Sequence, residues 1–406
     1  AFSKYRPYIA LASGLIFIVS GMLPLSQVLG AIDFNVLLMI IGTMGLVALF
    51  IESKMPSLLA DLIMERVPNV RWAAVALALF AGIISAFVDN VATVLMVAPV
   101  ALEVCKKLKT NPVPIVISIA VSSNLQGAAT LVGDTTAIML GSYADMSFLD
   151  FFWYKGRPSM FFAVEIGAVI SAAILAFLFR KEKGKVPKGT PRTVVTDYVP
   201  TVLLVGAILL LILASFLPVK PAVTNGLICC ALMLVGILYN FARKRSRNAI
   251  LEPLKAIDLE TIGLLAGLFV MIGGITARGV IDAAANLLAQ AGGGDVFLLY
   301  TVIVWASVLI SAFVDNIPFA ATMVPVIQVM AQTQGVDLHV LAWALSMGTD
   351  LGGSATPIGA SANVVGTSVA AKNGHPVTWG KYCRYCAPAT IMVMAVSMVC
   401  IVVRYM

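Results

Sequence analysis

The sequence predicts an all-α polytopic membrane protein built from two inverted repeats. Three observations carry this prediction: the composition, the long apolar runs and an internal repeat. Of the 406 residues, 60% are apolar and only 12% are charged, whereas a soluble domain carries roughly 25% charged residues. The composition therefore excludes a soluble enzyme, a disordered chain and a nucleic-acid-binding protein. The net charge of +7 does not indicate nucleic-acid binding, because the basic residues lie in short loops between apolar runs.

The apolar runs predict the number of membrane crossings, since a spanning helix needs about 20 mostly apolar residues. Runs of this kind occupy residues 7–25, 35–52, 158–180, 199–217, 222–242, 260–276 and 385–403. Runs 114–145 and 339–367 are interrupted by glycine and polar residues, which predicts two broken transmembrane helices. Stretches 72–104 and 296–328 have Asp-Asn near their middles and are short for two crossings, so we expect re-entrant helical hairpins. The prediction is about nine crossings plus two hairpins.

The distribution of lysine and arginine predicts the orientation. With the N-terminus in the cytoplasm and each hairpin returning to its own side, 22 basic residues lie inside and 5 outside. Cytoplasmic loops carry such an excess. We therefore expect a multi-pass protein of a prokaryotic cell (inner) membrane, surrounded by lipid, with the N-terminus cytoplasmic and the C-terminus outside. Two full crossings in place of each hairpin would give the same parity.

One sequence repeat runs through the chain. The segment Ser85–Asn90, Ser-Ala-Phe-Val-Asp-Asn, recurs in the second half as Ser311–Asn316. The same offset pairs Leu125–Gly133 with Leu351–Gly359, with five of nine positions identical. Five predicted crossings separate the two halves, and an odd number gives them opposite orientation. Inverted repeats with interrupted helices are typical of secondary transporters whose binding site lies near the membrane midplane.

The repeat also predicts the domain organisation. We expect an N-terminal span over residues 1–30, a first repeat over 31–180, a basic linker with two spans over 181–255 and a second repeat over 256–406. Residues 55–70 are predicted to form an amphipathic helix on the inner membrane surface.

Five acidic residues lie at membrane depth in this prediction, and no lysine or arginine does: Asp89, Asp134, Glu165, Asp315 and Asp350. An ionisable group inside the membrane indicates a functional site by default. Without a basic partner, such a carboxylate must be protonated, bind a cation or cap a helix. Capping alone stays an alternative for all of them except Glu165, which could instead extend to the membrane surface.

Amides, hydroxyls and glycines accompany these acids. The candidate polar ligands for the substrate or ion are Asn90, Asn124, Thr130, Asn316, Ser354, Thr356, Ser361 and Asn363. The glycines that would let the chain turn sharply and approach a ligand are Gly127, Gly133, Gly353 and Gly359. Sodium is a candidate ion at Asp89, Asn90, Asp315 and Asn316. No nucleotide-binding motif occurs, so we expect no cofactor beyond a coupling H⁺ or Na⁺, and no enzymatic activity.

At the two Ser-Ala-Phe-Val-Asp-Asn turns and at Gly359–Gly366, the sequence resembles the ion transporter superfamily, and within it the branch of arsenite permeases, NhaD antiporters and the P protein. It is similar more distantly to sodium–dicarboxylate symporters and citrate transporters. The resemblance implies a homodimer with a scaffold domain and a transport domain that moves as an elevator. It also implies a site that uses Asp89, Asn90, Asn124, Thr130 and Asp134 from the first half and Asp315, Asn316, Asp350, Thr356 and Asn363 from the second. One departure is Gly133–Ala137, which lacks the prolines and the asparagine that many relatives carry there.

Three transport functions stay open at this stage, besides a passive channel or scaffold. The first is proton- or sodium-coupled transport of a small inorganic solute, with arsenite or antimonite efflux leading because arsenous acid is neutral and needs no basic ligand. The second is sodium–proton antiport by the same acids. The third is sodium-coupled symport of an anion or dicarboxylate, against which the acidic site argues. An accessory ATPase subunit is neither predicted nor excluded.

Overall fold

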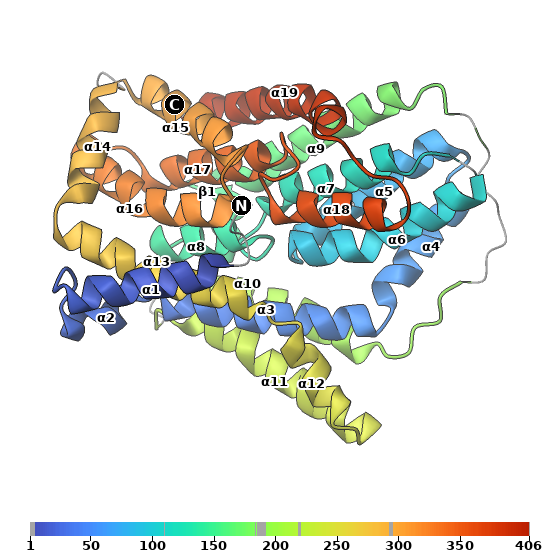
Figure 1. Cartoon of the computed structure of the whole chain (residues 1–406), viewed down its shortest axis with the longest axis horizontal. Coiled ribbons are helices and arrows are strands. Elements are labelled where there is room, and N and C mark those ends of the chain that lie inside the picture. The colour runs from blue at the N-terminus through green and yellow to red at the C-terminus, as the bar shows by residue number, and fades with distance from the viewer. Residues whose placement is uncertain are drawn as a thin grey trace.

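The computed structural model of the chain describes residues 5–108, 110–182, 184, 192–217, 221–291 and 295–405. Within these ranges it is almost entirely helical, which agrees with the predicted all-α class (Figure 1). The helices of the first half are α1 Arg6–Val19, α2 Leu25–Ala31, α3 Phe34–Glu52, α4 Met55–Arg66, α5 Val70–Ser85, α6 Asn90–Leu108, α7 Val113–Gly127, α8 Thr135–Tyr143, the 3₁₀ helix η2 Phe148–Phe151 and α9 Met160–Leu178. They continue as α10 Val199–Ser215, α11 Thr224–Lys244, α12 Asn248–Lys255, α13 Leu259–Ala277, α14 Val280–Ala291, α15 Val296–Ser311, α16 Asn316–Gln334, α17 Leu338–Gly353, α18 Ser361–Lys372 and α19 Trp379–Tyr405. Strands β1 Trp153–Tyr154 and β2 Arg157–Pro158 form a small antiparallel hairpin.

The helices form two layers (Figure 1). The lower layer contains α1, α3 and α10–α13, with α3 packed on α11 and α1 packed on α13. The upper layer contains α5–α9 and α15–α19. Helices α4 and α14 run between the layers at opposite ends of the molecule. A single chain therefore presents two helical bodies joined by two connecting helices.

Helix boundaries follow the register of the sequence repeat. Helices α5, α6 and α7 recur as α15, α16 and α17 at the offset of the two Ser-Ala-Phe-Val-Asp-Asn segments, and only the starts of α7 and α17 depart from it, by one position. Helices α3 and α4 recur as α13 and α14, at an offset that is shorter by one at both ends. The predicted hairpins are thus the pairs α5–α6 and α15–α16, with turns at residues 86–89 and 312–315.

Both predicted broken helices are interrupted over seven residues. Helix α7 ends at Gly127 and α8 begins at Thr135, while α17 ends at Gly353 and α18 begins at Ser361. Asp134 caps α8 by accepting a hydrogen bond from the backbone N–H of Thr135 at 2.6 Å. Irregular backbone at membrane depth is tolerated only where protein or water satisfies its polar groups. Here the two hairpin tips provide partners, as described below.

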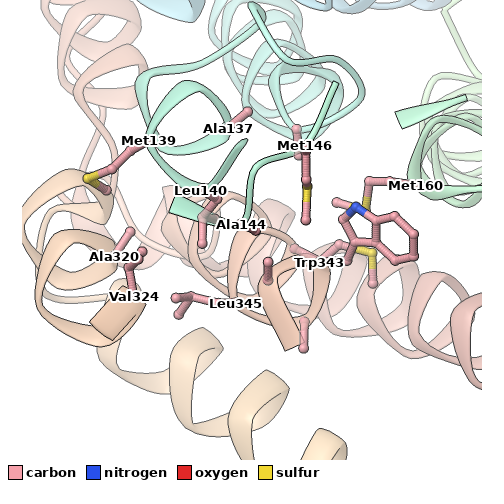
Figure 2. Close-up of a cluster of buried hydrophobic side chains, with 14 of the residues drawn as sticks. Ala137, Met139, Leu140, Ala144, Met146, Met160, Ala320, Val324, Trp343 and Leu345 are labelled. Carbon is pink, nitrogen blue, oxygen red and sulfur yellow. The ribbon is translucent and has the colours of Figure 1, made fainter. Parts of the chain in front are cut away.

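The two halves interlock at α8. Met139 and Leu140 of α8 face Ala320 and Val324 of α16, and Leu345 of α17 lies beside them (Figure 2). All five side chains are buried in one hydrophobic cluster. The short helix of the first broken pair therefore packs among helices of the second half, which brings the two unwound segments together.

The N-terminal segment differs from its prediction. The expected span 7–25 is a 14-residue helix that ends at Val19, because Gly21 adopts φ 71° and Pro24 precedes the separate helix α2. Within the described residues, five helices are long and apolar enough to cross a membrane, namely α3, α9, α11, α13 and α19, and five apolar helices are shorter. The amphipathic segment 55–70 contains α4. Residues 183 and 185–191 of the predicted basic linker lie outside the described residues.

Candidate functional site

Four helix N-termini meet at one cavity between the two layers. Residues at the starts of α6, α8, α16 and α18 line it from the upper layer: Asn90, Thr135, Asn316 and Ser361. The lower layer contributes Met44, Val47, Ala48 and Ile51 of α3, and Ala256, Asp258 and Thr261 around the start of α13. The cavity has a volume of about 410 Å³, which is within the range for small-molecule sites. Its position between two helical bodies suits a solute that both bodies must contact.

Asp89 and Asp315 occupy equivalent places at the two hairpin tips. The Asp89 carboxylate accepts a hydrogen bond from the N–H of Ala92 at 3.0 Å and lines the cavity. The Asp315 carboxylate accepts one from the N–H of Ile317 at 3.3 Å. Both acids therefore cap the second helix of their hairpin, as the capping alternative expects. Asp315 also forms an ion pair with Arg6 at 2.8 Å, so this acid has a basic partner that the sequence pattern does not predict.

The asparagines that follow these acids make equivalent bonds in the two halves. Asn90 Nδ2 donates to Asn124 Oδ1 at 3.1 Å, and Asn316 Nδ2 donates to Asp350 Oδ1 at 3.1 Å. Asn124 and Asp350 occupy equivalent positions of the sequence repeat. The same asparagine bond therefore occurs in both halves, with an amide as its acceptor in the first and a carboxylate in the second.

Asp134 and Asp350 come together from opposite halves. Asn316 Nδ2 lies 3.1 Å from an oxygen of each carboxylate. Thr136 Oγ1 donates to Asp350 at 2.7 Å, and Ser346 Oγ donates to it at 3.3 Å. Asp134 is 3% exposed and Asp350 is fully buried. Within the described residues neither carboxylate forms an ion pair with a basic side chain.

Two neighbouring buried carboxylates need charge compensation. Taking two like charges into a low-dielectric interior is costly, so a proton or a cation must balance at least one of them. Asp134 lines the cavity, while Asp350 lies behind it. The pair can therefore exchange a proton or a cation with the cavity through Asp134.

The unwound segments are held against the hairpin tips by matching contacts. Thr130 Oγ1 donates to the carbonyl of Ala86, and Thr356 Oγ1 donates to the carbonyl of Ala312. Gly133 lies against the carbonyls of Ser85, Ala86 and Gly127, so that a Cβ atom would be 2.9 Å from the first two oxygens. Gly359 lies against the equivalent carbonyls of Ser311, Ala312 and Gly353, with a Cβ placed 2.7, 3.0 and 2.5 Å away.

Asn363 fastens the two broken helices to each other. Its Nδ2 donates to the carbonyls of Gly353 and Thr356, at 2.8 and 2.9 Å. Its Oδ1 accepts from Asn124 Nδ2 at 2.8 Å. One buried amide thus connects the second unwound segment to helix α7. It stabilises the polar network behind the cavity wall.

Not every predicted residue reaches the cavity. The structure places Asp89, Asn90, Asp134, Asn316 and Ser361 at its wall. The others lie behind the wall or at its edge, in the polar network that supports it: Asn124, Thr130, Asp315, Asp350, Thr356 and Asn363. Ser354 is buried, and its hydroxyl lies 3.5 Å from the carbonyl of Asp350. Gly127 and Gly353 end the two broken helices, and Glu165 is on α9, away from the residues that line the cavity.

Sequence reasoning missed several polar residues of the site, including Thr135 and Thr261 of the cavity wall. Thr136 and Ser346 hold Asp350, Asp258 faces the cavity from the lower layer, and Arg6 pairs with Asp315. A signal existed for Asp258, because Ala-Ile-Asp at 256–258 repeats residues 31–33. Thr136 carried none, since it reaches Asp350 only through the packing of α8 against α17. Ser346 lies one turn before Asp350 on the same helix α17.

The electrostatic balance of the site depends on protonation. Each helix N-terminus carries roughly +0.5 elementary charge, so the four together supply roughly +2. Asp89, Asp134 and Asp350 oppose this with three carboxylates, Asp258 adds a fourth from the lower layer, and Arg6 balances Asp315. One or two protons or cations bound at these acids would therefore change the net charge that a solute meets. Within the described residues, no group of three or more His, Cys, Asp or Glu side chains is arranged to hold a metal ion.

Paired hairpins, broken helices and a cavity that carries carboxylates and amides, in an apolar helical chain, define a multi-pass membrane transporter. Comparison with known proteins gives the family. The citrate transporter family profile matches residues 3–348. A 46 kDa membrane protein of Mycobacterium leprae is 33% identical over 330 residues, which cover 79% of this chain and 75% of that protein. The chain belongs to the citrate transporter family, within the ion transporter superfamily.

Further relatives agree with this assignment. A protein of Mycobacterium tuberculosis named as an uncharacterized transporter is 30% identical over 391 residues, covering 92% of this chain and 87% of its own. The mouse P protein is 26% identical over 450 residues, and the match covers 92% of this chain and 54% of the P protein. The crystal structure of the YdaH transporter of Alcanivorax borkumensis has the same fold, with a TM-score of 0.66, 13% identity and 98% of both chains covered. The predicted resemblance to the superfamily is confirmed, and the chain is a secondary transporter by family.

Proposed function

We propose that this protein is a proton- or sodium-coupled secondary transporter that carries a small oxygen-rich solute through the cavity between its layers. The observation that carries the proposal is the buried Asp134–Asp350 pair, which is bridged by Asn316 and joined to the cavity by Asp134. A pair of this kind binds a proton or a cation from one side of the membrane and releases it on the other. The coupling ion and the solute then share one site.

Arsenous acid or its antimony analogue is the first candidate substrate, exported from the cell. Among the described residues, the cavity wall carries amides, hydroxyls, carboxylates and helix N-termini but no lysine or arginine. A neutral oxyacid fits such a wall in either protonation state of the acids. Export would follow exchange against the coupling proton.

Citrate or another carboxylate is a candidate because the family description names it. Four helix N-termini favour an anion, and the carboxylates at and behind the cavity wall oppose one. A carboxylate substrate would therefore require protons or sodium ions at the acids before it binds, which is the requirement for symport. Sodium–proton antiport by the same acids, with Na⁺ at Asp89 and Asn90 or at Asp315 and Asn316, is the remaining candidate.

The proposal also includes an elevator movement of one layer and a homodimer. The lower layer would serve as the scaffold and dimer interface, and the upper layer as the domain that moves like an elevator. Helices α4 and α14 connect the layers at opposite ends, where hinges would be required. The two halves would be inverted repeats in an inner membrane, with the N-terminus cytoplasmic and the C-terminus outside.

Purified protein in liposomes with an imposed pH gradient and an internal pH dye tests the proposal. Arsenite, Na⁺ and citrate would be added separately, arsenite and citrate first without sodium. We expect one of them to dissipate the gradient, and the Asp350→Asn variant to lose that proton flux. Dissipation by arsenite alone supports metalloid–proton exchange, and dissipation by Na⁺ alone supports antiport. If Asp350→Asn moves protons with the solute as the natural protein does, the role of the carboxylate pair is wrong.

A further inference from the structure

An ion pair joins the first helix to the tip of the second hairpin. Arg6, at the start of α1, donates from a terminal guanidinium nitrogen to Asp315 Oδ2 at 2.8 Å. The Arg6 side chain is 44% exposed and that of Asp315 is 8% exposed. A guanidinium stays charged under all physiological conditions, so this contact persists unless the two segments separate.

Asp315 is a junction of three elements. Besides the bond from Arg6, it accepts from the N–H of Ile317 at the start of α16, and Ser361 Oγ at the start of α18 lies 3.4 Å from Oδ2. Ile317 and Ser361 both line the cavity. The carboxylate that Arg6 holds therefore lies at the edge of the cavity, in contact with two elements that line it.

Helix α1 is fixed to the lower layer. Gly267 of α13 packs so closely on Ala10 that a Cβ there would lie 2.6 Å from the Ala10 carbonyl oxygen. Farther along, Phe17 covers Gly274 of α13. These close contacts pack α1 tightly on α13. The Arg6–Asp315 pair consequently crosses from the lower layer to the upper layer.

The first hairpin tip has no such tie. Asp89, the equivalent of Asp315, forms no ion pair with any basic side chain in the described part of the chain. It faces the open cavity instead. The repeat is therefore asymmetric at its two tips, because one is held to the lower layer and the other borders the cavity.

We propose that the Arg6–Asp315 pair is a clasp that holds the second hairpin tip on the lower layer and opens once in each transport cycle. Arg6 is a positioning residue, which acts on the tip and not on the solute. The clasp rests on the proposed function, since it has a role only if the upper layer moves against the lower one. When that layer moves, Asp315 leaves Arg6 and the tip becomes free.

Hydrogen–deuterium exchange on the full chain in lipid nanodiscs, without added solute, tests the clasp. We expect Arg6→Gln to raise the amide exchange rate of residues 312–317 about twofold to tenfold, as loss of one partly buried ion pair allows. Asp315→Asn should do the same, and the double variant should exchange no faster than either single variant, since both remove one interaction. Arg6→Lys should restore much of the protection.

The matched control is Lys155→Gln, which breaks an ion pair with Asp337 that lies within the upper layer at 2.6 Å. It should leave residues 312–317 unchanged. Unaltered exchange at this tip in Arg6→Gln would overturn the clasp, and so would additive effects in the double variant. A raised KM in Arg6→Gln with an unchanged tip would make Arg6 a solute ligand and would also overturn it. Amide exchange is measured without solute, whereas the proposed function is tested by proton flux in liposomes. The clasp can therefore be refuted while the transport function is supported, and the transport function can be refuted while the clasp is supported.

Discussion

Replacing Gly133 or Gly359 with alanine should destabilise the protein by about 1–2 kcal/mol in each case. Neither glycine has a positive φ, so the cost is steric and not conformational. At Gly359 the new methyl group would lie 2.5–3.0 Å from three carbonyl oxygens of the chain. Backbone oxygens cannot rotate away as a flexible side chain can. Overpacking of this kind costs about 1–3 kcal/mol, and the reduced freedom of the unfolded chain offsets it by about 0.4–1 kcal/mol.

Reversible unfolding in mixed detergent micelles measures the free energy of unfolding for each variant. Gly206→Ala is the control, because Gly206 lies inside α10 and no atom outside its own surroundings comes within 4 Å of its Cβ position. That substitution should stabilise the protein by about 0.5–1 kcal/mol. The reasoning is refuted if Gly133→Ala and Gly359→Ala behave like Gly206→Ala. That result would mean that the unwound segments do not press on the hairpin tips.

Three further predictions concern other contacts. Asn124→Asp should lower the free energy of unfolding by about 1–3 kcal/mol near neutral pH, because a carboxylate would face Asn363 Oδ1 where an amide now donates. The same unfolding titration in micelles measures this change. An unchanged free energy of unfolding would contradict the assigned bond. The Arg192 guanidinium, which hydrogen-bonds Glu65 through both oxygens at 2.7 Å, lowers the pKa of that carboxyl. The stabilisation from that pair is therefore present above the unfolded-state pKa and lost as the pH falls through the lower folded-state value, so melting temperatures of the natural protein and of Glu65→Gln should converge in acid. Ser142→Ala removes the 2.7 Å bond from α8 to the aspartate that caps α3, and should cost about 0.5–1.5 kcal/mol by the same titration; a larger loss would show that this bond is a principal tie between the layers.

Much of the fold could be predicted from the sequence, for a physical reason. The nearly constant offset of the repeat gives matching hairpins and matching breaks in both halves, since glycine and Asp-Asn pairs end helices wherever they recur. Bounds such as Val70–Ser85 and Val296–Ser311 follow it to the residue. Composition alone gave the membrane class, because an apolar chain with so few charges cannot cover its surface in water.

The site could be predicted in part. The repeat located Asn90 and Asn316 and their acids, and the structure brings these residues to one cavity and its edge. Contacts between the halves could not be predicted, because they depend on how α8 lies against α16 and α17. The bond from Thr136 to Asp350 joins residues 214 positions apart and has no counterpart in the repeat.

Arg6 was missed for a related reason. A continuous span over 7–25 places residue 6 in a cytoplasmic loop, far from the hairpin tips. The break at Gly21 shortens the helix, and the packing of α1 on α13 brings Arg6 beside Asp315. The local sequence predicts helix α1, but the pairing of Arg6 with Asp315 depends on the tertiary packing.

The asymmetries of the repeat point to where coupling resides. Gln126 fills the space above Gly82 in the first half, while in the second the small residue is Gly352 and the larger one is Val308. The two halves have the same backbone register at this contact. The large residue is on α7 in the first half and on α15 in the second. The charges were not exchanged in this way, since Asp350 stands where the first half has Asn124, and Asp134 stands where the second half has Ala360. Each half therefore supplies one carboxylate that the other lacks, and Asn316 holds the two together. The charge-compensation site is therefore built from one acid of each half and lies where the two halves meet.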